Sequence, residues 1–291
     1  MVASDTKSLV EYLARFDLTL SVMQDAAAIE RIAYELAEDN ARENVRWLEV
    51  RFCPALNTRK GLTAESAIEA ALSGLARAQA DLSIRTGLIV CGLRQLDPAA
   101  NRGLAELAVS YRERGVVAFD LAGPEDGHPP RRHQEAFQVA AAANLAITIH
   151  AGEAYGPESI RQALQECGAK RIGHGTRLEE DAELLAYVRD IRIPLEVCLT
   201  SNIQTHAVPS YRQHPLRRYF DEGVIVTLNT DNRMISGTTL TDEYEHAHRE
   251  MGFGWDELVE IARMGFRSAF VRRDEKAGLL VQVEAEITNL G

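Results

Sequence analysis

The chain has 291 residues, of which 46% are hydrophobic and 26% are charged, with 20 Gly and 9 Pro. This composition supplies enough apolar side chains for a large core and differs from that of disordered or fibrous proteins. The 32 Lys and Arg stand against 43 Asp and Glu, giving a formal charge of −11. Because no basic run could neutralise a row of phosphates, nucleic acid is excluded as an expected partner.

Four widely spaced cysteines form no Cys-x-x-Cys pair. Three of them lie in apolar runs, where a reduced thiol packs as a small hydrophobic side chain. The N-terminal segment lacks the apolar centre of a signal peptide, and the longest near-apolar stretch, residues 137–149, is too short to cross a bilayer. We therefore expect a cytoplasmic protein with no membrane partner.

Apolar, β-branched runs alternate with segments of helical periodicity along the whole chain. Ser8 and Glu11 form a capping-box pattern that opens a predicted amphipathic helix. The seven strands predicted after it are residues 47–53, 87–93, 116–123, 146–152, 171–175, 193–201 and 224–231. The helical segments between them usually begin at an acidic residue, Ser or Pro and end near Gly or Asn. Because the apolar runs are continuous, they indicate strands buried on both faces, as in a parallel sheet covered by helices.

This order of elements fits an α/β barrel or a doubly wound sheet. Polar residues end five of the seven runs, and in a barrel such strand ends meet at one mouth. A doubly wound dinucleotide-binding sheet would have G-x-G-x-x-G after its first strand, and the chain has no such motif. We predict an α/β fold with a single domain, residues 1–291. It is a TIM-type (β/α)8 barrel lacking its first strand, with seven parallel strands and extra helices.

Three strand ends carry residues suited to metal-assisted hydrolysis. His150 and Glu153 end the fourth run around a glycine that permits a sharp turn, and His174 stands between two glycines at the end of the fifth. Asp231 ends the seventh run, where a carboxylate must be paired, exposed or bound to a metal. Each residue alone could belong to the core or a turn. Together they offer zinc ligands, a proton donor and a second histidine near a zinc-bound hydroxide.

Six segments carry a specific resemblance. They are EDNARENVRWLEVRFCP at 38–54, DLAGPE at 120–125, HAGE at 150–153, GHG at 173–175, EVCLTSN at 196–202 and LNTDN at 228–232. In order and approximate spacing they resemble the motifs of the adenosine deaminase family, which are zinc-dependent barrel hydrolases. The resemblance covers nearly the whole chain.

This resemblance implies a role for each matching residue. His150 and Asp231 resemble zinc ligands of the family, and Asp231 would also hold the attacking water. Glu153 resembles the acid that protonates purine N1, and His174 the residue that acts as a base or as an electrostatic stabiliser. Gly123 resembles the glycine whose backbone N–H meets purine N3. The implied reaction is attack of zinc hydroxide at C6 of adenosine or 2′-deoxyadenosine, giving inosine and ammonia.

The chain departs from the family pattern at its start, because no H-x-H motif precedes Trp47. One His and one Asp would face zinc, where a catalytic site normally has three or more protein ligands. His246 and His248 have the missing spacing but lie in a helical segment, where residues i and i+2 point about 200° apart. We therefore expect poor metal binding, which would limit the activity of the chain as written. Met1 is interpreted as an internal start or a truncation point, and the alternative is a catalytically silent nucleoside-binding paralogue.

The second departure is Asn232, where better-known members have an Asp beside purine N7. An amide can donate or accept a hydrogen bond but cannot share a proton as a carboxylic acid does. Adenosine remains the expected substrate, and another 6-aminopurine compound is the alternative. The expected partner is thus a small purine nucleoside, and the sequence leaves the oligomeric state open.

Two further groups of residues have less specific interpretations. An apolar stripe on one predicted helix face could cover the mouth as a lid or pack in the core; it comprises Tyr12, Phe16, Leu20 and Met23. A segment after the sixth strand contains His206, Tyr211, His214 and Pro215. It is interpreted as a solvated loop, and the alternative is contact with the ribose near the barrel mouth.

Overall fold

The structure is a computed structural model that describes residues 2, 6 and 8–289. The chain divides into two compact units. Unit 1 comprises Met1–Phe16, Leu121–Gln134 and Ile147–Ser268, and unit 2 comprises Asp17–Asp120, Glu135–Ala146 and Ala269–Gly291. The single domain predicted from the sequence remains a prediction.

In unit 2, β1 (Trp47–Phe52) pairs in parallel with β2 (Arg85–Leu93). Next to β2 begins β3 (Val116–Ala122), and the backbone N–H of Leu88 donates to the carbonyl of Gly115 at 2.9 Å. Gly87–Leu93 of β2 are all buried, as expected for a strand covered on both faces. The helices of this unit are α2 (Phe16–Val22), α3 (Ala26–Arg42), α4 (Ala64–Asp81), α5 (Pro98–Ser110), α6 (Gln134–Ala142) and α14 (Arg273–Thr288), with 3-10 turns η1 (Pro54–Asn57) and η2 (Arg112–Arg114).

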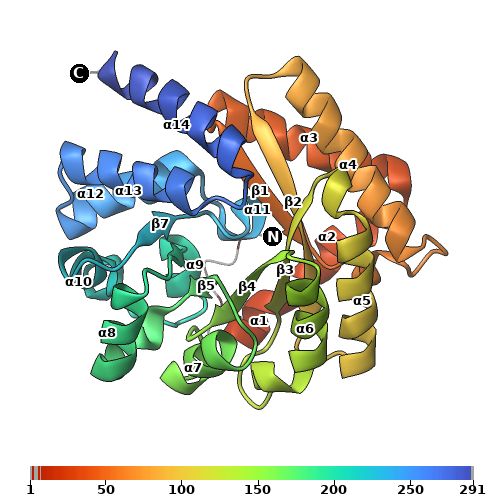
Figure 1. Ribbon diagram of the computed structural model, residues 1–291, viewed down its shortest axis with the longest axis horizontal. Helices are drawn as coiled ribbons and strands as arrows, with labels where there is room; N and C mark the ends of the chain where they lie inside the picture. The colour runs from red at the N-terminus through yellow and green to blue at the C-terminus, as the bar shows by residue number, and fades with distance from the viewer. Residues whose placement is uncertain (1, 3–5, 7, 290–291) are drawn as a thin grey trace. The chain divides into compact units, whose positions relative to one another are not determined.

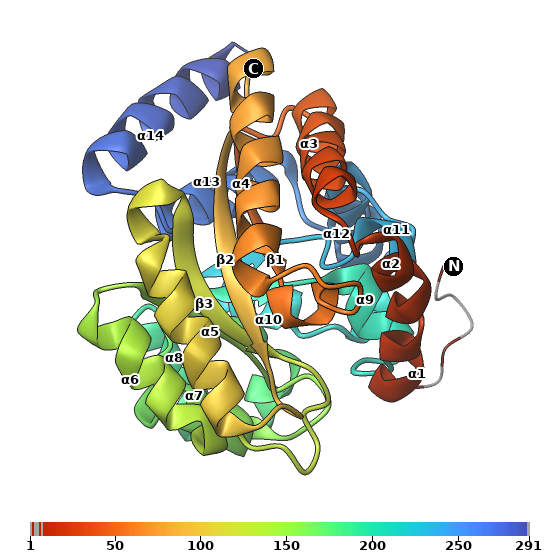
Figure 2. The same cartoon turned by 90° about the vertical axis from the view of Figure 1, so that its right-hand side faces the viewer.

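Helices α3 and α4 lie side by side in unit 2 (Figures 1 and 2). Their close approach depends on Gly74 of α4, because a Cβ atom there would collide with the backbone oxygen of Glu30 in α3. The segment 38–54, which was singled out in the sequence, forms the end of α3 and the whole of β1 in this unit.

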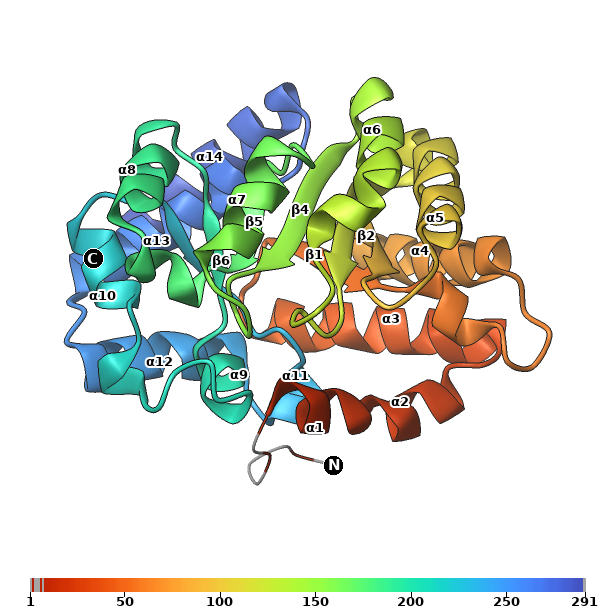
Figure 3. The ribbon, with the colours of Figure 1, turned by 90° about the horizontal axis from the view of Figure 1, so that it is seen from below.

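In unit 1, the end of β3 is followed by four parallel strands, β4 (Ala146–Ala151), β5 (Arg171–His174), β6 (Leu195–Val197) and β7 (Val226–Leu228), which pair in chain order. Figure 3 shows helices α7 and α8 beside these strands. The helices are α1 (Leu9–Ala14), α7 (Pro157–Gln165), α8 (Ala182–Asp190), α9 (Leu199–Gln204), α10 (Leu216–Asp221), α11 (Arg233–Ser236), α12 (Leu240–Met251) and α13 (Trp255–Ser268), with 3-10 turns η3 (Pro130–His133), η4 (Thr176–Glu180) and η5 (Tyr211–Gln213).

The seven predicted strands and their parallel α/β organisation are confirmed. The boundaries of the sixth were wrong, since β6 ends at Val197 and helix α9 begins at Leu199. The apolar run could not reveal this, because the turn into α9 is stabilised by the side chain of Glu243, which accepts a hydrogen bond from the backbone N–H of Thr200 at 3.2 Å.

The N-terminal prediction is partly confirmed. Ser8 caps α1, and its hydroxyl accepts a hydrogen bond from the backbone N–H of Glu11 at 3.2 Å. The single helix expected for the apolar stripe was wrong, because α1 ends at Ala14 and α2 begins at Phe16. The N–H of Arg15 bonds to the carbonyl of Tyr12 at 3.1 Å, an i→i−3 contact typical of a helix end. None of the described helices combines the length and apolar character needed to cross a lipid bilayer.

Candidate active site

Unit 1 contains every candidate site residue found in the sequence. His150 lies on β4 and Glu153 just after it, while His174 ends β5. Asp231 and Asn232 follow β7. Because parallel strands share one C-terminal edge, these side chains start from the same edge of the sheet.

The ends of β4 and β5 bring two imidazole rings and a carboxylate together. In the strand register, His150 lies opposite Gly173. The ring centroids of His150 and His174 are 5.2 Å apart, and Nε2 of His174 lies 3.6 Å from Oε2 of Glu153. The predicted grouping of His150, Glu153 and His174 is therefore present in the structure.

Glu125 holds the backbone of the loop that carries Glu153. The buried Glu125 carboxylate accepts hydrogen bonds from four successive backbone N–H groups, those of residues 152 to 155, at 2.6, 3.0, 2.7 and 2.9 Å. Hydrogen bonds to an ionised acceptor are stronger than neutral ones. Glu125 therefore positions the start of the Glu153 side chain, a role that its place after the third strand did not reveal.

Glu153 is itself buried, with a residue exposure of 6%. Its Oε1 accepts a hydrogen bond from the hydroxyl of Thr205 at 2.9 Å. Burial raises the pKa of this carboxyl; the Asp231 and Glu125 charges act in the same direction, while His174 and the Thr205 hydroxyl oppose the rise. A carboxyl whose protonated form is favoured in this way is suited to deliver a proton.

His174 has a left-handed backbone, with φ of 63°, and the following Gly175 has φ of 66°. The ring is buried, with a residue exposure of 2%, and its Nδ1 lies 2.9 Å from the side-chain nitrogen of Asn202. Non-glycine residues with positive φ are uncommon and gather at functional sites. The strand end thus directs the other ring nitrogen, Nε2, toward Glu153.

Two side chains hold the Asp231 carboxylate. The hydroxyl of Ser201 donates to Oδ2 at 2.7 Å, and the amide of Asn232 donates to Oδ1 at 2.7 Å. The backbone of Asp231 is also left-handed, with φ of 53°. Each carboxylate oxygen thus accepts one hydrogen bond and keeps one further lone pair for another partner.

Helix α1 meets this region through Tyr12. Its hydroxyl lies 2.8 Å from that of Ser236 in α11, and the amide of Asn232 donates to it at 3.3 Å. Figure 3 shows α1 beside α11. Tyr12 is 2% exposed and packs edge-to-face on Phe16, with ring centroids 5.9 Å apart. Tyr12 is therefore a packed part of unit 1 next to the candidate site.

Gly123 follows β3 with φ of 102°. An L side chain rarely adopts this backbone conformation, so the position favours glycine. Its expected role, binding through the backbone N–H, stays a prediction.

The histidine-rich segment after α9 differs from the solvated loop predicted for it. His214 is 4% exposed, its Nε2 lies 3.1 Å from Oδ1 of Asn202, and its Nδ1 accepts from the N–H of Leu216. Tyr211 stacks on His246 with ring centroids 4.1 Å apart. The solvated-loop prediction was wrong for His214, because tertiary partners satisfy the hydrogen bonds of its buried ring, whereas His206 is exposed as predicted.

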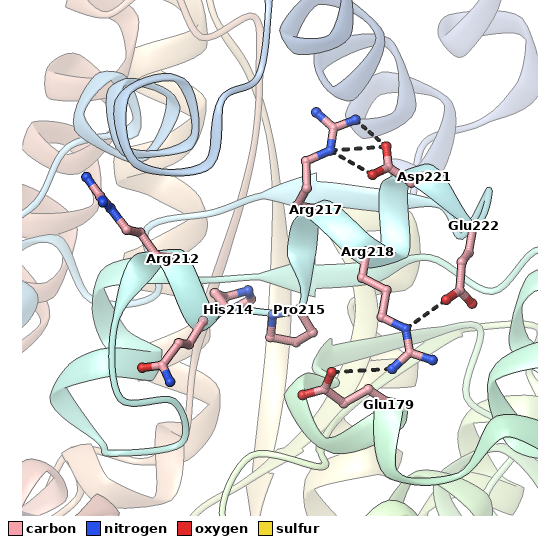
Figure 4. Close-up of a pocket in the computed structure, with 9 residues that line it drawn as sticks. Glu179, Arg212, His214, Pro215, Arg217, Arg218, Asp221 and Glu222 are labelled. Atoms are coloured by element: carbon pink, nitrogen blue, oxygen red, sulfur yellow. Dashed lines mark hydrogen bonds and ion pairs between the residues drawn. The ribbon is translucent and has the colours of Figure 1, made fainter.

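A surface cavity of about 490 Å³ is lined by His214 together with Arg217 and Arg218 (Figure 4). Its arginines are already engaged: Arg217 pairs with Asp221, and Arg218 pairs with Glu222 at 2.7 Å. Arg218 also lies 3.6 Å from Glu179. The cavity is therefore lined by arginines whose charges are already balanced by neighbouring carboxylates. The group of His150, Glu153 and His174 at the strand ends remains the candidate active site.

Within residues 2, 6 and 8–289, no three His, Cys, Asp or Glu side chains are grouped so that they could hold one ion. His246 and His248 lie on α12, as predicted, and Nδ1 of His248 lies 2.8 Å from the carbonyl of Phe253. A catalytic zinc site uses about three protein ligands, so the described residues do not complete one.

The chain is similar to known purine deaminases along almost all of its length. The profile of the adenosine deaminase family matches residues 1–286. Adenosine deaminase of Clostridium kluyveri is 40% identical over 268 residues, which cover 92% of this chain and 77% of that relative. A probable adenosine deaminase of Dictyostelium discoideum is 42% identical over 263 residues, covering 90% of this chain, and the chain spans only 34% of that relative's length.

Solved structures extend the comparison to the fold. Adenine deaminase from Arthrobacter aurescens superposes with a TM-score of 0.93 at 26% identity, covering 98% of this chain and 87% of that structure. The N6-methyl-AMP deaminase of Arabidopsis thaliana gives a TM-score of 0.86 at 30% identity, covering 96% and 84%. A Burkholderia amidohydrolase with bound zinc gives 0.87 at 26% identity, covering 92% and 75%. These matches confirm the predicted TIM-type barrel class.

Proposed function

Because the chain belongs to the adenosine deaminase family, we propose that it hydrolytically removes the 6-amino group of a purine nucleoside, adenosine or 2′-deoxyadenosine. The products are inosine, or its deoxy form, and ammonia. The single observation that carries this proposal is the buried Glu153 carboxyl, which lies between Thr205 at 2.9 Å and His174 at 3.6 Å.

Deamination of an aminopurine needs a proton on the ring and an oxygen at C6. Protonated Glu153 delivers its proton to N1. The protonated ring nitrogen withdraws electron density from C6, so that C6 becomes more electrophilic and the water oxygen can add to it. His174 lies beside the reacting atoms and either accepts a proton or stabilises the charge that develops on the added oxygen. The amino group takes up one proton of the added water and leaves as ammonia when the C6–N bond breaks, and the second proton of the water returns to Glu153. A positioned proton donor contributes roughly 10²–10⁴-fold in rate.

Two groups would orient the purine. We propose that the backbone N–H of Gly123 meets N3 and that the amide of Asn232 lies beside N7. The amide of Asn232 donates to Asp231 and to Tyr12 at 2.7 and 3.3 Å. Asn232 can thus bind a base through its remaining acceptor or by exchanging one of these bonds.

Zinc is the metal we propose for this site, with His150 and Asp231 as ligands. When bound, zinc would activate the water by lowering its pKa to about 7. The surroundings of Asp231 fit a role as a metal ligand, because Ser201 and Asn232 orient its carboxylate with one hydrogen bond to each oxygen. The described residues do not complete the ligand set, so the steps above are assigned only to side chains of the chain itself.

The alternative is another 6-aminopurine compound. Its support is the structural similarity to an adenine deaminase and to an N6-methyl-AMP deaminase, together with an amide at Asn232. A catalytically silent nucleoside-binding protein is the second alternative. The proposed compartment is the same for all of these functions. The four cysteines are buried and none of them forms a disulfide, which favours the reducing cytoplasm.

The decisive experiment measures ammonia release and purine binding by the zinc-supplemented chain. Adenosine, 2′-deoxyadenosine, adenine, AMP and N6-methyl-AMP are compared, with Glu153→Gln as the variant and Glu183→Gln, at an exposed position of α8, as its control. We expect the highest kcat/KM for adenosine or its deoxy form and a loss of about 10²-fold or more in Glu153→Gln. A higher kcat/KM for adenine or a nucleotide would show that adenosine is not the preferred substrate. Purine binding without ammonia release would establish the catalytically silent alternative.

A further inference from the structure

The ring nitrogens of two buried histidines are connected through one asparagine side chain. The connection begins at the backbone N–H of Leu216, which donates to Nδ1 of His214 at 3.0 Å. A backbone N–H can only donate, so Nδ1 of His214 must be the acceptor. A neutral His214 therefore carries its proton on Nε2.

Burial keeps His214 neutral. The residue is 4% exposed, and removal from water, with a smaller contribution from the charge of His174, lowers the pKa of His214 to about 3. At neutral pH the ring thus has one N–H, at Nε2, and one lone pair, at Nδ1.

The orientation of the Asn202 amide follows from this N–H. Nε2 of His214 lies 3.1 Å from Oδ1 of Asn202, and an N–H donor requires an oxygen acceptor there. Asn202 consequently directs its NH₂ group to Nδ1 of His174, at 2.9 Å. Because Asn202 is fully buried, with 0% exposure, water does not compete for these bonds.

We propose that Asn202 and His214 are positioning residues that fix the tautomer of His174. Nδ1 of His174 is occupied as an acceptor, so its neutral ring carries the proton on Nε2, the nitrogen 3.6 Å from Glu153. For the proposed reaction, on which this assignment of a role rests, neutral His174 presents a hydrogen-bond donor to the reacting atoms. It stabilises the charge on the oxygen added at C6 and does not act as the first base through Nε2.

The test reads the tautomer directly. Long-range ¹H–¹⁵N spectra of the uniformly ¹⁵N-labelled chain distinguish a protonated from an unprotonated ring nitrogen, and His174→Gln and His214→Gln assign the signals. We expect Nε2–H for both rings. In Asn202→Asp, a carboxylate of the same shape can only accept, so the proton of His174 should move to Nδ1. Ammonia release from adenosine should then fall roughly 10²–10³-fold in kcat, with KM changed less than about threefold.

Matched variants separate this role from general destabilisation. Asn144→Asp adds the same charge at an exposed asparagine and should leave tautomer and kcat unchanged. His214→Gln retains an N–H near the Nε2 position and should keep the His174 tautomer, whereas His214→Phe removes it and should give a mixture. This pair decides the question even if Asn202→Asp fails to fold.

Two results would overturn the proposal: a His174 ring protonated at Nδ1 in the parent chain, or an unchanged tautomer in His214→Phe and in Asn202→Asp where that variant folds. The tautomer is measured without substrate, so it is independent of the proposed activity. If the parent chain released no ammonia from adenosine, the proposed function would fail while the assignment of the tautomer would still stand or fall by the spectra.

Discussion

Gly173 lies so close to His150 that a side chain at the glycine would touch the histidine. A Cβ atom at Gly173 would be 3.1 Å from Cα and 3.3 Å from Cγ of His150. The two residues are opposite each other in the β4–β5 register. The glycine therefore allows the His150 ring to lie over the neighbouring strand, where it meets His174.

Gly173→Ala should displace His150 and disturb the candidate active site. The crowded contact involves backbone and ring atoms, so we expect a loss of about 1–3 kcal/mol in the free energy of unfolding and at least a tenfold loss in kcat/KM. Gly103→Ala is the control, because its Cβ would have no neighbour within 4 Å and Gly103 lies inside helix α5. That variant should gain about 0.5–1 kcal/mol. Equal behaviour of the two in urea unfolding would contradict the packing argument.

Glu125→Gln should weaken the loop that carries Glu153. An amide has one acceptor oxygen, and its NH₂ group would face backbone N–H groups that now donate to the carboxylate. We expect a loss of about 2–4 kcal/mol in unfolding free energy and a lower kcat. Denaturant unfolding and steady-state ammonia release measure the two effects.

Glu183→Gln is the matched control for this prediction, because Glu183 is exposed on α8. Its stability should change by less than about 0.5 kcal/mol. If Glu125→Gln were as harmless as Glu183→Gln, the four hydrogen bonds would not hold the loop.

Much of the fold could be predicted because its strands are buried on both faces. Continuous apolar runs such as Gly87–Leu93 mark such strands in sequence. Their ends could not be predicted from the runs. The predicted strand 224–231 contracts to Val226–Leu228, after which the side-chain amide of Asn229 donates to the hydroxyl of Thr227 at 2.8 Å and to its carbonyl at 3.1 Å.

The candidate site shows the same division. His150, His174 and Asp231 could be found because each ends a strand with a chemistry-bearing side chain. The residues that orient the reacting groups come from distant parts of the chain, and no local pattern predicts the contacts: Asn202 lies 28 positions from His174, and Thr205 lies 52 positions from Glu153. Polar residues at strand ends thus identify the reacting groups in the sequence. The hydrogen bonds that orient these groups depend on tertiary structure and could not be predicted.

Tyr12→Phe should loosen α1 without removing its apolar contact. The variant loses the hydrogen bond of 2.8 Å to Ser236, which is buried, and keeps the ring that packs on Phe16. We expect a cost of about 0.5–1.5 kcal/mol and faster proteolysis within α1. Tyr187→Phe, on an exposed tyrosine of α8, is the control and should change stability by less than about 0.5 kcal/mol. Similar proteolysis rates for both variants would show that the hydroxyl does not hold α1.

Stability in acid should depend on His214. Its pKa is lowered to about 3 in the folded chain by burial, whereas an unfolded histidine has a pKa of about 6.5. Between these values the unfolded chain binds one more proton than the folded chain. The free energy of unfolding therefore falls as the pH falls through this window, by up to about 1.4 kcal/mol per pH unit.

His214→Gln removes this titration. The variant should be less stable than the parent chain at pH 7.5, because Leu216 loses its acceptor, but the difference should narrow as the pH falls toward 4. Urea unfolding of both chains at intervals of half a pH unit measures the two curves. Parallel curves from pH 7.5 to 4 would mean that His214 takes up a proton in the folded chain as readily as in the unfolded one. The hydrogen bond from Leu216 to Nδ1 would then be broken in acid, and with it the orientation of Asn202 toward His174.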